Sequence, residues 1–195
     1  QVVTFSLPGT ADAISCFTDR HTGQTFPVQS AADNSVHVLL ALGANQELEL
    51  SPTTDRPVFS PVHLNTDKQT AVLSNDKLAL RLAYGSWRAP TPAGVDGTTQ
   101  PGPIVGVRIA NGNWRGRTLL DTRQHLLSWT GTLTEEGLIR CVYEYRAHLV
   151  DGSSYRMRIT LDAEQVFARI DEEFSAHETD QIVWDFSSDD LPKEA

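Results

Sequence analysis

Acidic side chains are the first candidates for chemistry in this sequence of 195 residues. Glycosidic bonds are cleaved by two carboxylates that lie roughly 5 to 10 Å apart across a sugar. Asp171 and Glu173 suit this chemistry if they lie in a strand, because residues two apart then share one face. His148 is a candidate general base wherever an acidic side chain lies beside it. These three are the candidate catalytic residues, against the alternative that all of them lie on an ordinary solvated surface.

Tryptophan next to arginine is the second chemical signal. Trp87 and Arg88 open a stretch rich in proline and glycine, whereas Trp114 and Arg115 follow an Asn-Gly turn. Aromatic faces pack against sugar rings and arginine donates hydrogen bonds to hydroxyls, so this combination suits a neutral polyol. The predicted substrate-binding residues are Trp87, Arg88, Trp114, Arg115 and Trp129. The alternative is that the tryptophans pack in the core, as large aromatic residues often do.

The sequence lacks the motifs of several common catalytic and ligand-binding sites. It contains no nucleophile elbow, phosphate-binding loop, dinucleotide fingerprint or EF-hand loop. Its six histidines lack the spacing of metal ligands, so we expect neither a metal nor a cofactor. The two cysteines, Cys16 and Cys141, form either one disulfide or two buried thiols. We favour buried thiols, because unbonded cysteine is among the most buried residue types.

Composition limits the class of protein and its partners. Hydrophobic residues make up 39% of the chain and charged residues 21%, enough for a folded core. The net charge of −9 repels phosphate backbones and anionic lipids, so neither nucleic acid nor a membrane is an expected partner. No apolar run is long enough to span a bilayer. Because the chain begins with Gln1 and no leader pattern follows, we expect a processed or excised piece.

Short apolar runs between turn residues predict antiparallel strands along the whole chain. Strict alternation at 78–84, after a Ser-Asn-Asp turn, predicts a hairpin, and similar alternation appears at 36–42 and 47–50. The segment 51–63 contains three prolines and is predicted to be a connector rather than a central strand. The segment 89–103 is a second interruption, and such long loops are usually functional or mobile.

The segment 137–174 fits two interpretations. In the helical one, Thr132 and Glu135 form a capping box before one apolar face, and a second face follows Asp162. In the strand interpretation, apolar residues alternate along 139–149, 155–161 and 166–174. We favour strands, because β-branched and aromatic residues prefer a pleated surface.

The strand interpretation also predicts which charged residues face each other. A three-residue loop at 151–153 would place Arg146 opposite Arg158 and His148 opposite Arg156. The resulting polar face, rich in Arg, Glu and His, is either a solvated surface or a concave ligand-binding face.

The next turn, near Ala163, would place Arg156 opposite Asp171 and Arg158 opposite Arg169. Like charges would then face each other directly. Diagonal contacts of Arg158 with acidic neighbours would relieve that repulsion.

These segments resemble the β-sandwich modules of carbohydrate-active enzymes related to the galactose-mutarotase-like supersandwich. The resemblance lies in the successive strand patterns of 134–145, 151–161 and 166–174. Residues 18–29 and 36–50 resemble the small β region that often precedes a supersandwich in large bacterial glycosidases and polysaccharide lyases, and 75–84 resembles its opening hairpin. Because 195 residues are few for both parts, the resemblance implies an N-terminal portion of a larger enzyme.

The expected fold class is all-β, an antiparallel β-sandwich of supersandwich type with few or no helices. Its expected divisions are a small N-terminal β region at 1–65, the β-sandwich at 66–186 and a linker or tail at 187–195.

The resemblance implies a non-catalytic or accessory domain of a polysaccharide-degrading enzyme, secreted or periplasmic. Its implied partners are carbohydrate and a catalytic domain of the same longer chain, on which it packs. Three alternatives remain: a stand-alone carbohydrate-binding module, a self-sufficient glycosidase, lyase or sugar epimerase, and a purely structural sandwich.

Overall fold

A computed structural model describes residues 1–6, 15–31, 35–43, 46–55, 57–122, 124–175 and 181–186. In this part of the chain the elements are antiparallel strands and one short 3-10 turn, η2 (Gly97–Thr99). The predicted all-β antiparallel sandwich is therefore confirmed. The predicted tail at 187–195 lies outside the described residues.

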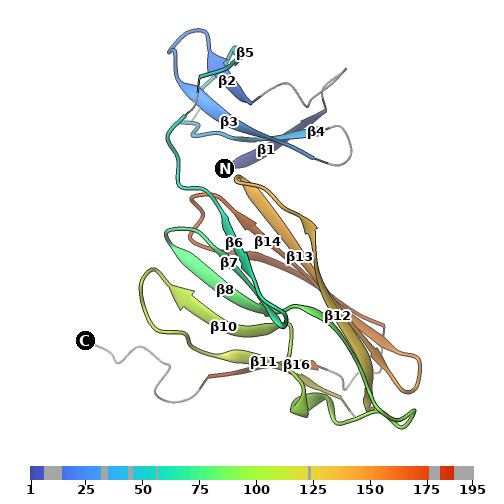
Figure 1. Ribbon diagram of the computed structural model, residues 1–195. Helices are drawn as coiled ribbons and strands as arrows, with labels where there is room; N and C mark the ends of the chain where they lie inside the picture. The colour runs from blue at the N-terminus through green and yellow to red at the C-terminus, as the bar shows by residue number, and fades with distance from the viewer. Residues whose placement is uncertain are drawn as a thin grey trace.

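The N-terminal sheet lies at the top of Figure 1 and has five antiparallel strands. In spatial order they are β1 (Val2–Ser6), β4 (Ser35–Leu39), β3 (Thr25–Ser30), β2 (Cys16–Asp19) and β5 (Leu50–Thr53). Phe17, Phe26 and Val36 belong to its own small apolar core. Among the described strands β5 pairs with β2 at the edge of the sheet, and this position tolerates Pro52, which lacks a backbone N–H. The start of the predicted connector thus belongs to an edge strand.

Two further sheets face each other and form the sandwich (Figure 1). The four-stranded sheet runs β10 (Ile104–Ile109), β8 (Leu78–Ala83), β7 (Thr70–Ser74) and β6 (His63–Thr66). The five-stranded sheet runs β15 (Arg169–Phe174), β14 (Ser154–Asp162), β13 (Arg140–Leu149), β12 (Leu126–Glu135) and β9 (Gly85–Arg88). A separate ribbon pairs β11 (Arg117–Asp121) with β16 (Gln181–Asp185).

The main core lies between these two sheets and accounts for the alternation along their strands. Tyr143, Tyr145, Tyr155 and Met157 are each at most 1% exposed, and the residues between them in β13 and β14 include the charged ones. This period of two requires a pleated backbone, so the helical interpretation of 137–174 is excluded.

The pairing of β13 with β14 differs from the predicted register. Arg146 lies opposite Arg156, and His148 lies opposite Ser154. The Leu149 N–H donates to the Ser153 carbonyl, so the loop that joins the strands is centred on Asp151 and not on Gly152, and Gly152 takes a φ of +88°. That change moves the pairing by two residues, which keeps the apolar faces together and re-pairs the charged ones.

The pairing of β14 with β15 is shifted in the same way. Arg158 lies opposite Asp171, and Arg156 lies opposite Glu173. On the other side of β14, Glu144 lies opposite Arg158. Acids that were predicted at diagonal positions therefore lie directly opposite arginines, which is the more favourable arrangement.

Val166 was predicted to lie on the apolar face of the last long strand, and this is wrong. β15 begins only at Arg169, so Val166 lies in the preceding loop and is 70% exposed. Glu172 instead shares a face of β15 with Ile170 and Phe174, and its carboxylate accepts a hydrogen bond from the buried Tyr155 hydroxyl at 2.6 Å.

Cys16 in β2 and Cys141 in β13 are buried thiols that form no disulfide, which confirms the favoured prediction. Burial raises the pKa of the Cys141 thiol. The thiol is therefore protonated and unreactive at neutral pH.

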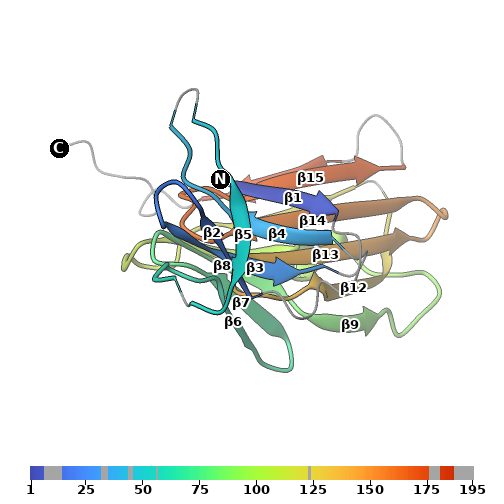
Figure 2. The same cartoon turned by 90° about the horizontal axis from the view of Figure 1, so that it is seen from above.

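The chain passes from the N-terminal sheet to the sandwich between Thr53 and His63. Figures 1 and 2 together show the N-terminal sheet seated on one end of the sandwich, at the β12–β13 turn. The predicted boundary near residue 65 falls inside β6 of the sandwich.

Candidate functional site

A surface cavity of about 300 Å³ opens beside Trp114, one of the predicted substrate-binding residues. Its polar lining comes from Arg115, Arg117 and Asp185, and Arg117 Nε donates to Asp185 Oδ2 at 2.9 Å. Gly106 lies under the indole, where an added Cβ would come within 3.2 Å of Trp114 Cε3. A glycine in β10 therefore leaves room for the tryptophan ring at the surface of the sheet.

Two arginines contact the same indole ring. The Cζ atom of Arg81 lies 4.3 Å from the Trp114 ring centroid, and that of Arg108 lies 4.9 Å from it. Such cation–π contacts contribute about 0.5 to 1 kcal/mol each near a surface and hold the ring in place. The sequence signal for these arginines was their alternation with apolar residues in two strands.

The other predicted substrate-binding residues lie in the five-stranded sheet. Trp129 is 7% exposed and stacks on Tyr145 with ring centroids 5.8 Å apart, so it packs in the core, as the alternative held. Trp87 lies opposite Trp129 in β9 and is partly buried against the same core. Arg88 is exposed at the end of β9. The Trp114 cavity draws none of its lining from these three residues.

The outward face of the five-stranded sheet carries a network of ion pairs around Glu144. This carboxylate is 9% exposed and accepts hydrogen bonds from Arg146 Nε and, at 2.9 Å, from Arg156 Nε. Two arginines that face each other in the register are therefore bridged by one acid. Arg156 also lies 3.8 Å from Glu173.

The candidate catalytic residues lie on this same charged face. Asp171 accepts from Arg169 Nε at 3.2 Å, and Asp171 and Glu173 line an open cavity of about 260 Å³. His148 is exposed opposite Ser154, and no acidic side chain in the described chain pairs with it. The three residues thus share one face without forming an acid and base pair.

Glu144→Gln is expected to destabilise the protein at neutral pH but not in strong acid. Burial raises the pKa of Glu144, yet the hydrogen bonds from Arg146 and Arg156 together outweigh burial and hold this pKa below its usual 4.5. A carboxylate with a lowered folded-state pKa stabilises above its unfolded pKa, and its contribution is lost as the pH falls through the folded value. Urea unfolding should show a loss of about 1 to 2 kcal/mol at neutral pH that fades below about pH 4.

Glu173→Gln is the matched control, because this acid is exposed and lies 3.8 Å from Arg156. This control substitution should lower the free energy of unfolding by less than about 0.5 kcal/mol. A Glu144→Gln deficit that stayed constant as the pH fell would contradict the charge argument.

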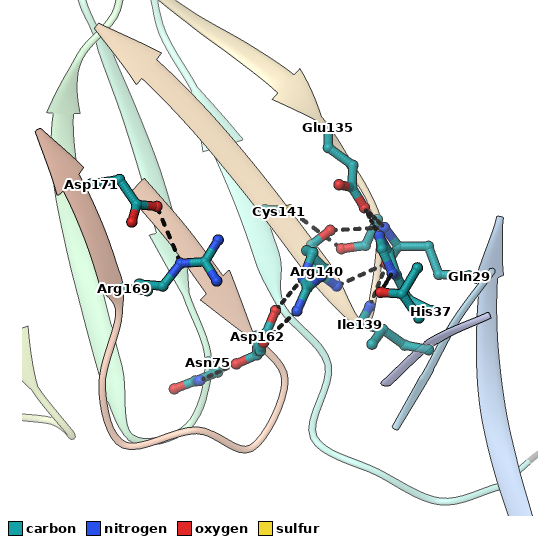
Figure 3. Close-up of polar contacts among 12 residues, drawn as sticks. Gln29, His37, Asn75, Glu135, Ile139, Arg140, Cys141, Asp162, Arg169 and Asp171 are labelled. Atoms are coloured by element: carbon teal, nitrogen blue, oxygen red, sulfur yellow. Dashed lines mark hydrogen bonds and ion pairs between the residues drawn. The ribbon is translucent and has the colours of Figure 1, made fainter. Parts of the chain in front are cut away.

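A second polar cluster joins the N-terminal sheet to the sandwich (Figure 3). The Gln29 side chain reaches from β3 to the β12–β13 turn, where its Oε1 accepts from the N–H groups of Ile139 and Arg140, each at 2.8 Å. Its Nε2 donates to Glu135 Oε1 at 2.7 Å and to the Arg140 carbonyl at 3.0 Å. Gly137 is required beside this amide, because any Cβ there would collide with the Gln29 side chain.

His37 completes the same cluster and was not singled out by its sequence pattern. It is 5% exposed in β4, with Nε2 2.8 Å from Glu135 Oε1 and Nδ1 2.9 Å from Thr4 Oγ1. The only sequence signal was a polar residue inside an otherwise apolar strand. Its burial at the junction of two sheets favours a structural role over a catalytic one.

Arg140 and Asp162 extend the cluster toward the edge of the sandwich (Figure 3). Arg140 donates from Nε and Nη2 to the two oxygens of Asp162, at 2.7 and 2.9 Å. Asn75, in the predicted β7–β8 turn, donates to the carbonyls of Asp162 and Gln165 at 3.1 and 2.9 Å. These contacts tie the two faces of the sandwich together at this end.

Among the described residues, no group of three or more His, Cys, Asp or Glu side chains is arranged to hold a metal ion. In that same part of the chain, no helix has the length and apolar character needed to cross a membrane.

No protein-family model, curated protein or solved structure matches this chain.

Proposed function

We propose that this chain is an accessory, non-catalytic β-sandwich domain of a secreted or periplasmic polysaccharide-degrading enzyme, either a glycoside hydrolase or a lyase. Its sandwich is proposed to be of the galactose-mutarotase-like type. The observation that carries the proposal is the Trp114 cavity, where an indole at the surface adjoins Arg115, Arg117 and Asp185. An aromatic wall with convergent hydrogen-bonding groups is the chemistry that a sugar ring requires.

The ion pairs on the five-stranded sheet support the non-catalytic assignment. Asp171 is paired with Arg169 and Glu173 lies near Arg156, on an open face of the sheet. A general acid needs a pKa raised by burial or by a neighbouring carboxylate, and arginine neighbours act in the opposite direction.

Exposed apolar side chains support packing on a catalytic domain of the same longer chain. Leu138, Val166 and Phe167 are 61 to 70% exposed, and Val58 is fully exposed. Their segments are neighbours, because Val62 N–H donates to the Leu138 carbonyl and Ala163 N–H donates to the Ile139 carbonyl. Apolar surface of this kind commonly marks a contact with another domain.

Trp114→Ala is expected to weaken oligosaccharide binding by roughly tenfold, because the loss of one aromatic contact with a sugar ring costs about 1.4 kcal/mol. The measurement is titration of the whole chain with a panel of neutral and acidic oligosaccharides, followed by tryptophan fluorescence. Trp184→Ala is the control, since this 42% exposed ring stacks on Phe186 and does not line the cavity.

The proposal fails if no oligosaccharide of the panel changes the fluorescence of the unmodified chain. It also fails if the purified chain itself degrades a polysaccharide and Asp171→Asn or His148→Ala abolishes that activity. In that case the self-sufficient enzyme would be the correct alternative.

A further inference from the structure

A second cavity adjoins the Trp114 cavity. Its volume is about 240 Å³, and the side chains of Val105 and Arg117 line both cavities. Ligand pockets in proteins usually measure roughly 300 to 1,000 Å³. The Trp114 cavity, at about 300 Å³, lies at the lower end of this range and the second cavity lies below it, whereas the two together lie well within it.

The Trp114 cavity lies where β10 and β11 meet without forming a continuous ladder. One backbone bridge joins Val107 to Arg115. Further along, Thr118 Oγ1 accepts from the Ile104 N–H at 2.9 Å and donates to the Ile104 carbonyl at 3.1 Å. The residues of both strands between these two contacts line the Trp114 cavity. The second cavity begins at the Thr118 contact, so one opening follows the edge of β10 past both cavities.

Val105 lies between the two cavities because β10 carries one extra residue there. Ile104 lies opposite Leu82 and Gly106 lies opposite Arg81, so Val105 forms a β-bulge. A bulge bends its strand and redirects a side chain, and bulges are frequent beside binding sites. Here the bulged residue supplies apolar lining to both cavities.

The segment 89–103, predicted to be a functional or mobile loop, forms the far wall of the second cavity. Its backbone is pressed against β11. A Cβ on Gly102 would collide with the Thr118 carbonyl, and a Cβ on Gly97 would lie 2.9 Å from the Leu120 carbonyl oxygen. A wall held by such close backbone packing is in place before a ligand arrives, which lowers the entropic cost of binding.

The polar lining of the second cavity is mostly neutral. Thr98, Thr99 and Gln100 bring hydroxyl and amide groups, and Arg117 Nε is already bound to Asp185 at 2.9 Å. Within the described chain, the Gln100 side-chain amide has no hydrogen-bond partner. An amide both donates and accepts, so it matches the hydroxyls of a sugar.

We propose that the two cavities together bind a stretch of a neutral polysaccharide that is at least two sugar units long. This inference rests on the proposed function, since it names the ligand class and the extent of the same site. One ring packs on Trp114, and a following unit passes over Val105 and bonds to Gln100.

The test is calorimetric titration of the whole chain with cello-, xylo- and manno-oligosaccharides of one to six units. One series should bind, and its tetrasaccharide should bind at least about tenfold more tightly than its monosaccharide. Gln100→Ala should weaken the tetrasaccharide by about three- to tenfold through the loss of a hydrogen bond, and should leave the monosaccharide unchanged. Trp114→Ala should weaken both.

Gln69→Ala serves as the control, because this exposed glutamine of the β6–β7 turn lines neither cavity. Its affinities should match those of the unmodified chain at every length. Circular dichroism of each variant verifies that the sandwich is folded, and the dependence on length in the unmodified chain tests the inference without any substitution.

Three results would overturn the inference. An affinity that does not rise with the length of the sugar would refute the second cavity as a binding site and leave the proposed function standing. So would a Gln100→Ala variant that binds the tetrasaccharide normally or weakens both lengths alike. Binding of none of the three neutral series would refute the inference, and the acidic oligosaccharides of the panel would then decide the proposed function.

Discussion

Replacing Gln29 by alanine is expected to lower the free energy of unfolding by about 3 kcal/mol. Its amide makes four hydrogen bonds to the β12–β13 turn, two of them from the N–H groups of Ile139 and Arg140 at 2.8 Å. Ile139 is 1% exposed, so water does not readily replace the lost acceptor. An unsatisfied buried donor costs about 1 to 3 kcal/mol, and this substitution leaves the buried Ile139 N–H and the partly buried Arg140 N–H without their acceptor.

Gln69→Ala is the matched control, because Gln69 is exposed in the β6–β7 turn. Urea unfolding of the whole chain should show a change below about 0.5 kcal/mol for the control. An equally small change for Gln29→Ala would mean that the N-terminal sheet is not held on the sandwich by this side chain.

Gly131→Ala is expected to destabilise the sandwich by about 3 kcal/mol or more. The Tyr143 hydroxyl donates a hydrogen bond to the Ala83 carbonyl, in the same place where a Cβ on residue 131 would lie. That Cβ would collide with the Ala83 carbonyl and would come within 2.5 Å of the tyrosine oxygen. Neither group can move freely, because Tyr143 is 0% exposed and the Ala83 carbonyl belongs to the backbone of strand β8.

Gly43→Ala provides the control, since a Cβ there would meet only Gln46 Oε1, at an ordinary 3.5 Å. It should leave the urea midpoint almost unchanged. Gly131→Ala with Tyr143→Phe should recover little, because the clash with the Ala83 backbone persists. Full recovery in that double variant would contradict the steric explanation.

The two substitutions test different levels of the architecture. Gly131 governs how closely β12 and β8 approach inside the sandwich, whereas Gln29 governs how the N-terminal sheet is attached to it. The Trp114 cavity lies within the sandwich and should keep its affinity in the Gln29→Ala variant.

The local pattern of apolar residues was sufficient to predict most of the strands. Alternation of apolar residues in 139–149 and 155–161 predicted strands whose buried face holds Tyr143, Tyr145 and Met157. The alternation of apolar and polar residues is present in the local sequence, so it predicts a strand without knowledge of the strands beside it. The predicted register was wrong because the loop lies one residue earlier in the chain than predicted, and the position of a loop is set by the strands on both sides.

The sequence pattern predicted only part of the candidate site. Trp114 and Trp129 were both predicted to bind substrate, yet one lies beside a surface cavity and the other is 7% exposed in the core. Which face of a sheet a tryptophan occupies follows from register, and register is a tertiary property. Arg81 and Arg108 lie far apart in sequence, and only the pairing of β8 with β10 brings them to one ring.

The sequence by itself determined the all-β class and the positions of most of the long strands, because both depend on the pattern of apolar residues. The tertiary structure alone decided which charges meet. It placed Glu144 between two arginines, Gln29 against the β12–β13 turn and four arginines around Trp114. Contacts between residues distant along the chain depend on strand order and register, and these are set when the whole core packs.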